Sequence, residues 1–319
     1  MINQRFLILF LVVSFVIILA FFNINSSSSY ETTEKPLQNK DIFLSEEKEC
    51  LTVKKLSIID EWSEIFNASE PQQKIKPDVL LQTLKFMIQE VDEHDPKLIE
   101  FVKSLIDQPS NKPFNLHEPN RKDFSQFGEA IYVDQMLNGQ RNGFVVEAGA
   151  LDGERFSNSL FFERERGWSG ILIEPLPYSY ESILNKNRKM HSINACIAKK
   201  TPIVAKFRAY KEGAYSGRNS AIGNSGVGKY DYIYVPCFSL STILKAINID
   251  KVDFFSLDLE GGEWDVLNSL DLKKINFKLF LIEHGGDMER KEKMTNYMIQ
   301  HNYALNKTDK VNIYLIKKE

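Results

Sequence analysis

The sequence predicts an α/β fold with a mostly parallel, doubly wound sheet and an antiparallel hairpin at its C-terminal end. From Gly143 onward, short apolar runs alternate with helical stretches, as in consecutive βα units. The predicted strands cover residues 144–148, 171–174, 192–197, 252–258 and 279–283. Near the C-terminus, the apolar runs 303–305 and 311–316 flank the polar residues 306–310, which predicts a hairpin.

Helices are predicted between these strands and ahead of them. Those of the βα units are centred on residues 157–166, 178–189, 240–247, 263–270 and 289–300. Upstream, residues 76–125 form a predicted helical preface. Its first helix carries apolar residues at helical spacing, namely Leu80, Leu84, Met87, Ile88 and Val91. Its second helix begins at Asp95-Pro96, an N-cap residue followed by proline at the first helical position. The main domain is predicted to span residues 126–319.

An uncharged apolar run occupies residues 6–22, with Ser14 as its only polar interruption. At ~1.5 Å per residue such a helix is roughly 25 Å long, which suits a transmembrane signal anchor over residues 6–24. A cleaved signal peptide is the alternative, but Ala20-Phe21-Phe22-Asn23 is a poor cleavage site. The serine tract at 26–29 offers only a weaker one. The polar segment 25–75 is then a stem.

Arg5 precedes this run, and no Lys or Arg follows until Lys35. The positive-inside rule therefore predicts a cytosolic tail at residues 1–5 and a type II protein whose main domain is luminal. Three Asn-x-Ser/Thr sequons agree with a luminal location, at Asn25, Asn67 and Asn306. In such an oxidising compartment Cys196 and Cys237 are the favoured disulfide pair; the alternative is that the cysteines are small buried hydrophobic residues.

The formal net charge is −3, and the Lys and Arg residues are scattered along the chain. A nucleic-acid partner is therefore not expected. The three cysteines match no zinc spacing, so no metal site is predicted.

The strongest local signal is the segment 144–153, an apolar strand that ends in Glu147 and leads through a glycine turn. Gly149 and Gly153 would let a ligand approach the backbone, with Asp152 between them. The turn lacks the G-x-G-x-x-G spacing of a dinucleotide site, which argues against a nicotinamide-dependent oxidoreductase. Glu147 would suit a cationic amino-acid moiety better than a diphosphate.

Further acids follow at the ends of later strands. Glu174 ends the next strand, where a carboxylate can accept hydrogen bonds from both hydroxyls of a ribose. Asp258 ends the predicted strand 252–258, Glu260 follows it, and both are predicted to project into the same crevice. His284 comes at the end of the predicted strand 279–283, directly after Glu283. We expect Asp258, Glu260 and His284 to orient the reactants or to remove a proton. For His284 a structural or surface role is the alternative.

Several segments together resemble the FkbM-type methyltransferase family: 147–153, 157–160, 167–175, 187–188 and 253–263. With Ser125-Gln126-Phe127-Gly128 and Asn142-Gly143, the chain resembles the Star-like branch of that family. The family resemblance implies a Rossmann-like fold and S-adenosylmethionine binding, with Glu147, Gly149, Asp152, Gly153, Glu174 and Asp258 at matching positions. The branch resemblance implies a type II membrane protein of the endoplasmic reticulum and Golgi that assists the transport of growth-factor precursors.

Two functions are therefore expected from the sequence. The first is O- or N-methyl transfer from S-adenosylmethionine by an enzyme anchored in secretory-pathway membranes. The second is a catalytically silent, Star-like membrane protein that keeps the fold and assists the transport of growth-factor-precursor cargo from the endoplasmic reticulum to the Golgi. A shared fold does not establish shared chemistry.

Overall fold

The computed structural model describes residues 59, 62, 75–210 and 230–318, all of which belong to one compact unit, Val53–Glu319. The predicted tail 1–5, the predicted anchor 6–24 and almost all of the predicted stem lie outside the described residues. Among the helices that the structure does describe, none has the length and apolar character needed to cross a bilayer.

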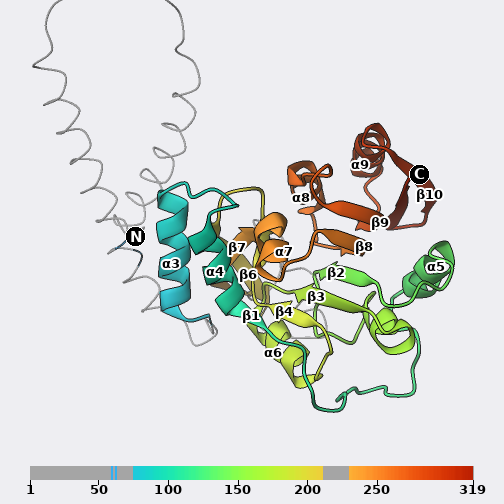
Figure 1. Ribbon diagram of the computed structural model, residues 1–319, viewed down its shortest axis with the longest axis horizontal. Coiled ribbons are helices and arrows are strands. Elements are labelled where there is room, and N and C mark those ends of the chain that lie inside the picture. Colours follow the sequence, from blue (N-terminus) through green and yellow to red (C-terminus); the bar gives the residue numbers. More distant parts are fainter. Residues whose placement is uncertain (1–58, 60–61, 63–74, 211–229, 319) are drawn as a thin grey trace, which may run out of the picture. The chain divides into compact units, whose positions relative to one another are not determined.

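The main sheet has eight strands in the order β1-β4-β3-β2-β8-β9-β11-β10 (Figure 1). The strands β4, β3, β2, β8 and β9 run parallel to one another, whereas β1 pairs antiparallel with β4, and β11 pairs antiparallel with both β9 and β10. Their bounds are β1 Ile106–Asp107, β2 Phe144–Ala148, β3 Ser169–Ile173, β4 His191–Ile193, β8 Lys251–Leu257, β9 Asn276–Glu283, β10 Tyr303–Thr308 and β11 Asn312–Lys317. The predicted parallel sheet and its C-terminal hairpin are confirmed.

Helices cover both faces of this sheet, which gives three layers. The side chains of alternate strand residues pack into two separate cores, one on each face of the sheet, because successive side chains of a strand point to opposite faces. Val146, Phe255 and Ile282 pack in the first core, under α4 (Pro96–Leu105), α7 (Leu240–Ala246), α8 (Glu263–Ser269) and α9 (Met288–Gln300). Val145 and Leu281 pack in the second, under α5 (Glu129–Met136), the π-helix η1 (Phe162–Arg166) and α6 (Pro177–Asn185).

A second, three-stranded sheet was not predicted. It has the order β5-β7-β6, with bounds Cys196–Ala198, Tyr230–Ser239 and Ile203–Tyr210. The predicted strand 192–197 was wrong in its second half, because the chain leaves the main sheet after Ile193 and enters the small sheet at Cys196. Asn194 stabilises the chain where it passes between the two sheets, because its Nδ2 donates to the carbonyl oxygens of Glu174 and Pro175, at 2.8 and 3.0 Å.

The predicted preface is part of the same compact unit. Helix α3 (Pro77–Ile88) packs with the small sheet through Leu80 and Leu84, and β1 pairs antiparallel with β4 of the main sheet. Asp95 caps α4 as predicted, since its carboxylate accepts from the backbone N–H groups of Lys97 and Leu98.

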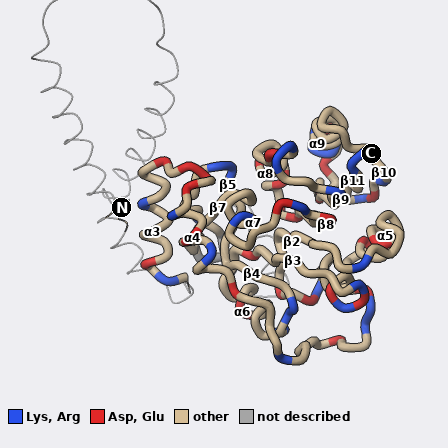
Figure 2. Tube along the Cα trace, viewed as in Figure 1, with Lys and Arg blue, Asp and Glu red and all other residues tan. Residues whose placement is uncertain are grey.

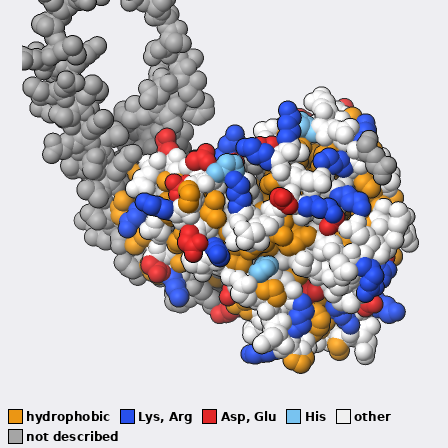
Figure 3. Space-filling model, in the orientation of Figure 1, with side chains coloured by type: hydrophobic (Ala, Val, Ile, Leu, Met, Phe, Trp, Pro, Cys, Tyr) orange, Lys and Arg blue, Asp and Glu red, His pale blue; other side chains and the backbone are white. Residues whose placement is uncertain are grey.

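Two details of the helix prediction were wrong. The predicted helix 157–166 shrinks to the π-helix η1, and α5 was missed. Acidic and basic residues are interspersed along the described chain (Figure 2). The face seen in Figure 3 likewise mixes basic, acidic and apolar side chains.

Candidate functional site

A cleft of about 670 Å³ opens at the carboxyl ends of the parallel strands, which is within the usual size range of small-molecule sites. Its floor comes from the ends of β2, β3 and β8, and one wall comes from the small sheet. The strand order turns back between β2 and β8, so the cleft lies at the topological switch point of the sheet. The residues that carry most of the lining are Gly149, 173–176, 195–199 and 258–262.

Gly149 sits where two strand ends meet on the floor of this cleft. Its φ is +85°, and a Cβ atom placed there would lie 1.9 Å from the carbonyl oxygen of Asp258. The contact is fixed from both sides. Gly149 N donates to Ile173 O at 3.0 Å, and Asp258 N donates to Ala148 O at 3.1 Å. Glycine is therefore required here by the close approach of β2 and β8.

Glu174 faces the cleft, as the sequence predicts, although the residue is only 4% exposed. Its two carboxylate oxygens accept from the backbone N–H groups of Leu151 and Leu176, each at 2.9 Å. Burial, together with the negative charges of Asp258 and Asp152, raises the pKa of Glu174 to about 8. A carboxylate can accept about four hydrogen bonds, so the two backbone donors leave about two acceptor sites unused.

Glu147 lies outside the lining of the cleft, and this differs from the expected contact with a ligand. Its carboxylate is buried and accepts from the hydroxyls of Ser157 and Ser159 and from the backbone N–H of Asn158. Burial raises the pKa of Glu147, while the nearby Arg188 opposes that rise. The side chain therefore holds the loop after β2 from beneath.

Asp152 and Gly153 also lie outside the lining of the cleft and stabilise the loop after β2. Asp152 Oδ1 accepts from the backbone N–H groups of Glu154 and Arg155, at 2.9 and 2.7 Å. Gly153 packs against α6, where an added Cβ would lie 3.2 Å from the Cα of Ile183. Its small size allows the loop to lie close to that helix.

Asp258 and Glu260 do lie in the cleft lining, as predicted. Asp258 contacts Glu283, and ligand oxygens of Asp258, Glu263 and Glu283 all lie within 4.8 Å of one another. The Asp258 side chain is open to solvent, yet protein surrounds it on most sides. This environment and the charge of Glu283 raise the pKa of Asp258 well above its usual value.

Three carboxylates this close could suit a hard cation. Glu263, however, is already committed. Its Oε1 accepts from the backbone N–H groups of Leu259 and Gly261, at 2.8 and 3.0 Å, and its Oε2 lies 3.5 Å from Arg290 Nη1. We therefore assign no metal to this group and treat Asp258 and Glu283 as a proton-sharing pair.

His284 is not brought together with the other expected catalytic residues. It is buried, and its backbone N–H donates to Val311 O beside the β10–β11 hairpin. Burial lowers the pKa of its ring, and the charges that act on it come from Lys291, Asp309 and Asp287. The acid to which the sequence argument gave no role is Glu283, which contacts Asp258. Successive side chains of a strand point to opposite faces, so only one of this neighbouring pair can face Asp258.

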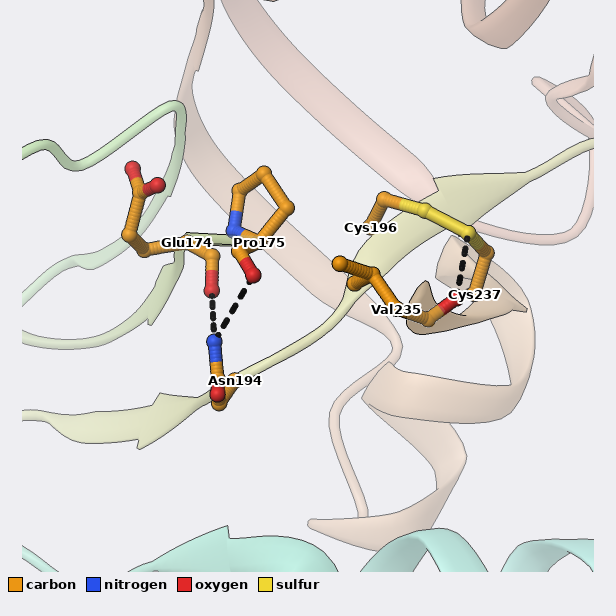
Figure 4. Close-up of a disulfide and its surroundings, with 6 residues drawn as sticks. All are labelled: Glu174, Pro175, Asn194, Cys196, Val235 and Cys237. Atoms are coloured by element: carbon orange, nitrogen blue, oxygen red, sulfur yellow. Dashed lines mark hydrogen bonds between the residues drawn. A yellow bond between two sulfur atoms is a disulfide. The ribbon is translucent and has the colours of Figure 1, made fainter. Parts of the chain in front are cut away.

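The disulfide lies in the wall of the cleft. The structure joins Cys196 of β5 to Cys237 of β7, which are register partners with Cα atoms 4.4 Å apart (Figure 4). The predicted pairing is confirmed. Cys196 itself lines the cleft, and Asn194 bridges the same region to Glu174 and Pro175 (Figure 4). The small sheet is thereby fixed next to the predicted ribose site.

The backbone around the cleft is strained in several non-glycine residues. Leu151 and Phe156 in the loop after β2 have φ of 50° and 61°, and Glu260 after β8 has φ of 54°. Side chains with a Cβ rarely adopt this region, and such residues concentrate at functional sites.

Part of the chain matches a known protein family. Residues 147–305 match the model of the family described as "Methyltransferase FkbM domain". No curated protein matches the chain.

Solved structures that resemble the chain are also methyltransferases. One is precorrin-6y C5,15-methyltransferase from Geobacter metallireducens (11% identity, TM-score 0.33, covering 64% of this chain and 95% of that one). A second is 1,6-didemethyltoxoflavin-N1-methyltransferase from Burkholderia thailandensis, solved with S-adenosylhomocysteine (8%, 0.31, 60% and 75%). A third is the human methyltransferase 10 domain containing protein (10%, 0.33, 70% and 96%). TM-scores this low carry no argument by themselves, so the assignment rests on the strand order and the family match.

Proposed function

Because this chain carries an FkbM methyltransferase domain on a Rossmann-like fold, we propose that it transfers a methyl group from S-adenosylmethionine to an oxygen or nitrogen of an acceptor. The observation that carries this proposal is the cleft at the switch point of the sheet. Buried Glu174 faces into it, and Gly149 lies on its floor.

The residues of the cleft fit the parts of that cofactor. Glu174 keeps acceptor sites for both ribose hydroxyls, while Leu176, Ala195 and Ile197 supply apolar surface for the adenine ring. When bound, the cofactor would supply an activated methyl group on a sulfonium. The protein's own contribution is then to align the reactants and to accept a proton from the acceptor where one is released.

Replacing Glu174 with alanine should weaken S-adenosylmethionine binding by about 1.5–3 kcal/mol, because a charge-assisted pair of hydrogen bonds is lost. Calorimetric titration of the full-length protein measures this. The control is Asp95→Ala. Asp95 also accepts from two backbone N–H groups, of Lys97 and Leu98, but does not line the cleft. Equal affinities of wild type and Glu174→Ala would refute the ribose assignment.

The same contact should give binding a pH signature. Since the pKa of Glu174 is raised to about 8, the unliganded group is mostly protonated below that pH. Affinity should therefore rise as the pH increases through about 8, and Glu174→Ala should lose this dependence. If the folded wild type binds no S-adenosylmethionine at any pH, the second function becomes the better account, a silent Star-like protein in cargo transport.

We further propose that the protein is anchored in membranes of the endoplasmic reticulum and Golgi by residues 6–24, with its main domain in the lumen. The disulfide Cys196–Cys237 supports this location, because disulfides persist mainly in oxidising compartments. Asn306, the sequon asparagine among the described residues, lies exposed on β10, where its Oδ1 accepts from the Tyr132 hydroxyl at 2.7 Å.

A luminal domain should carry N-linked glycans. Full-length protein expressed in animal cells is expected to migrate faster on a gel after endoglycosidase treatment. Asn67→Gln and Asn306→Gln should each remove one step of that shift, whereas Asn276→Gln, outside any sequon, should leave it unchanged. An untreated protein that already migrates at its unglycosylated mass would count against the luminal location.

A further inference from the structure

The wall of the cleft that comes from the small sheet includes a short segment, residues 195–199. The chain leaves the main sheet just before this segment, where Asn194 donates to the carbonyl oxygens of Glu174 and Pro175. The segment then continues as β5, a strand of three residues at the edge of the small sheet. Its register pairs with β7 are Cys196↔Cys237, Ile197↔Phe238 and Ala198↔Ser239. So short a ladder offers few backbone hydrogen bonds, and a crosslink between side chains therefore adds much to its hold on the wall.

The Cys196–Cys237 disulfide is that crosslink (Figure 4). Cys237 has a cleft-lining residue on each side, because its register partners are Cys196 of β5 and Ile203 of β6. The bond thus ties the wall to the middle strand of the small sheet. Cys196 lines the cleft, whereas Cys237 is fully buried and does not. A small thiol therefore reaches the disulfide at Cys196, through the cleft.

The same wall supplies part of the surface that we assign to the cofactor. Ala195 and Ile197, on either side of Cys196, are two of the residues proposed to contact the adenine ring. Cys196 also follows two residues after Asn194, whose hydrogen bond reaches Glu174, the proposed ribose ligand. A shift of Cys196 therefore disturbs the contacts of both parts of the nucleoside.

On the basis of the proposed function, we propose that the Cys196–Cys237 disulfide is a redox switch of the cofactor cleft. The oxidised protein binds S-adenosylmethionine, and reduction by a dithiol releases the wall 195–199 and weakens binding. In the proposed luminal location the oxidised, binding form prevails.

The reduction is an ordinary thiol–disulfide exchange. One thiolate of the dithiol forms a bond to the Cys196 sulfur. The protein's sulfur–sulfur bond breaks, and its electron pair leaves with the Cys237 sulfur, which takes up a proton. The second thiol of the reductant then displaces Cys196 in the same way. The protein gains two electrons and two thiols, and the reductant becomes a disulfide.

Calorimetric titration of S-adenosylhomocysteine into the full-length protein, before and after reduction with dithiothreitol, tests the switch. We expect the reduced protein to bind about tenfold more weakly, with its far-ultraviolet circular dichroism unchanged. The double variant Cys196→Ala/Cys237→Ala should bind like the reduced wild type, with or without dithiothreitol. Cys50→Ala, which leaves the pair intact, should keep the full response.

Thermodynamic reciprocity supplies a second readout. If the oxidised form binds about tenfold more tightly, saturating S-adenosylhomocysteine must make the disulfide about tenfold harder to reduce, because both effects express one coupling free energy. For a two-electron couple, this lowers the reduction potential by about 30 mV. Equilibration of Cys50→Ala protein in dithiothreitol redox buffers, followed by labelling of free thiols, measures the potential with and without the ligand.

Equal affinities of the oxidised and reduced forms, with a potential that the ligand does not change, would overturn this inference and leave the proposed function standing. Loss of folded structure on reduction would also overturn it, because the bond would then stabilise the whole fold instead of switching the cleft. Failure of the oxidised protein to bind S-adenosylhomocysteine at all would remove the proposed function, and this inference with it.

Discussion

Replacing Gly149 with alanine is expected to lower the free energy of unfolding by at least about 3 kcal/mol. Two costs add at this position. The residue has a φ of +85°, which a side chain with a Cβ adopts only with strain, and the new Cβ would lie 1.9 Å from the Asp258 carbonyl oxygen. That oxygen belongs to the backbone, so relief would require the ends of β2 and β8 to separate. Urea denaturation measures the loss.

Gly139 supplies a matched control for this substitution. Its φ is +65°, but nothing lies within 4 Å of the position of an added Cβ. Gly139→Ala therefore carries the conformational cost alone, about 1–2 kcal/mol. The difference between the two variants isolates the steric contact. Equal losses would mean that β2 and β8 do not approach as closely as the structure has them.

The parallel core could be predicted because its strands are short apolar runs separated by helical stretches. Strands β2, β3, β8 and β9 begin and end within a few residues of their predicted positions. The small sheet gave no such signal. Its longest strand, β7, contains Pro236, which usually argues against a strand, and β5 has only three residues. Its position depends on tertiary contacts such as the Cys196–Cys237 bond, which local periodicity does not encode.

The candidate site was predicted in part, since acids at the ends of parallel strands necessarily gather at one edge of the sheet. Glu174, Asp258 and Glu260 reach the cleft for this reason. The choice between Glu283 and His284 was harder. Strand β9 is covered on both faces, so its apolar residues do not alternate with polar ones and do not reveal which side chain points toward Asp258.

Glu147 shows a second limit of the sequence argument. Its position at the end of β2 suggested a ligand contact, but its partners, Ser157 and Ser159, come from a loop whose path only the folded chain fixes. What the sequence presented as one functional motif is therefore two things. Gly149 lines the cleft, while Glu147, Asp152 and Gly153 support the loop beside it.

Because this loop depends on buried contacts, we predict a second large loss of stability, on replacement of Arg188. Its side chain is buried, and its Nε lies 2.5 Å from Oε2 of Glu163. The guanidinium also donates to the Ser159 hydroxyl at 2.8 Å and to the carbonyl oxygen of Gly153. It also offsets the charge of Glu147. Arg188→Met keeps much of the side-chain volume but leaves two buried carboxyl groups without their cation. We expect a loss of about 3–5 kcal/mol in the free energy of unfolding.

The loss should depend on pH, and this separates charge from packing. Without the guanidinium, the pKa of Glu147 should rise further above its unfolded value. The folded variant then binds more protons than the unfolded chain, so its stability falls as the pH increases. Urea denaturation at pH 5 and pH 8 should therefore show the larger deficit at pH 8. Arg121→Met is the control, because Arg121 and Glu118 form an exposed pair worth less than about 1 kcal/mol. A deficit at Arg188 that is equal at both pH values would show that lost packing outweighs the unpaired charge. The loop after β2 would then depend on the shape of the arginine side chain, and Glu147 would have to be protonated already in the wild type.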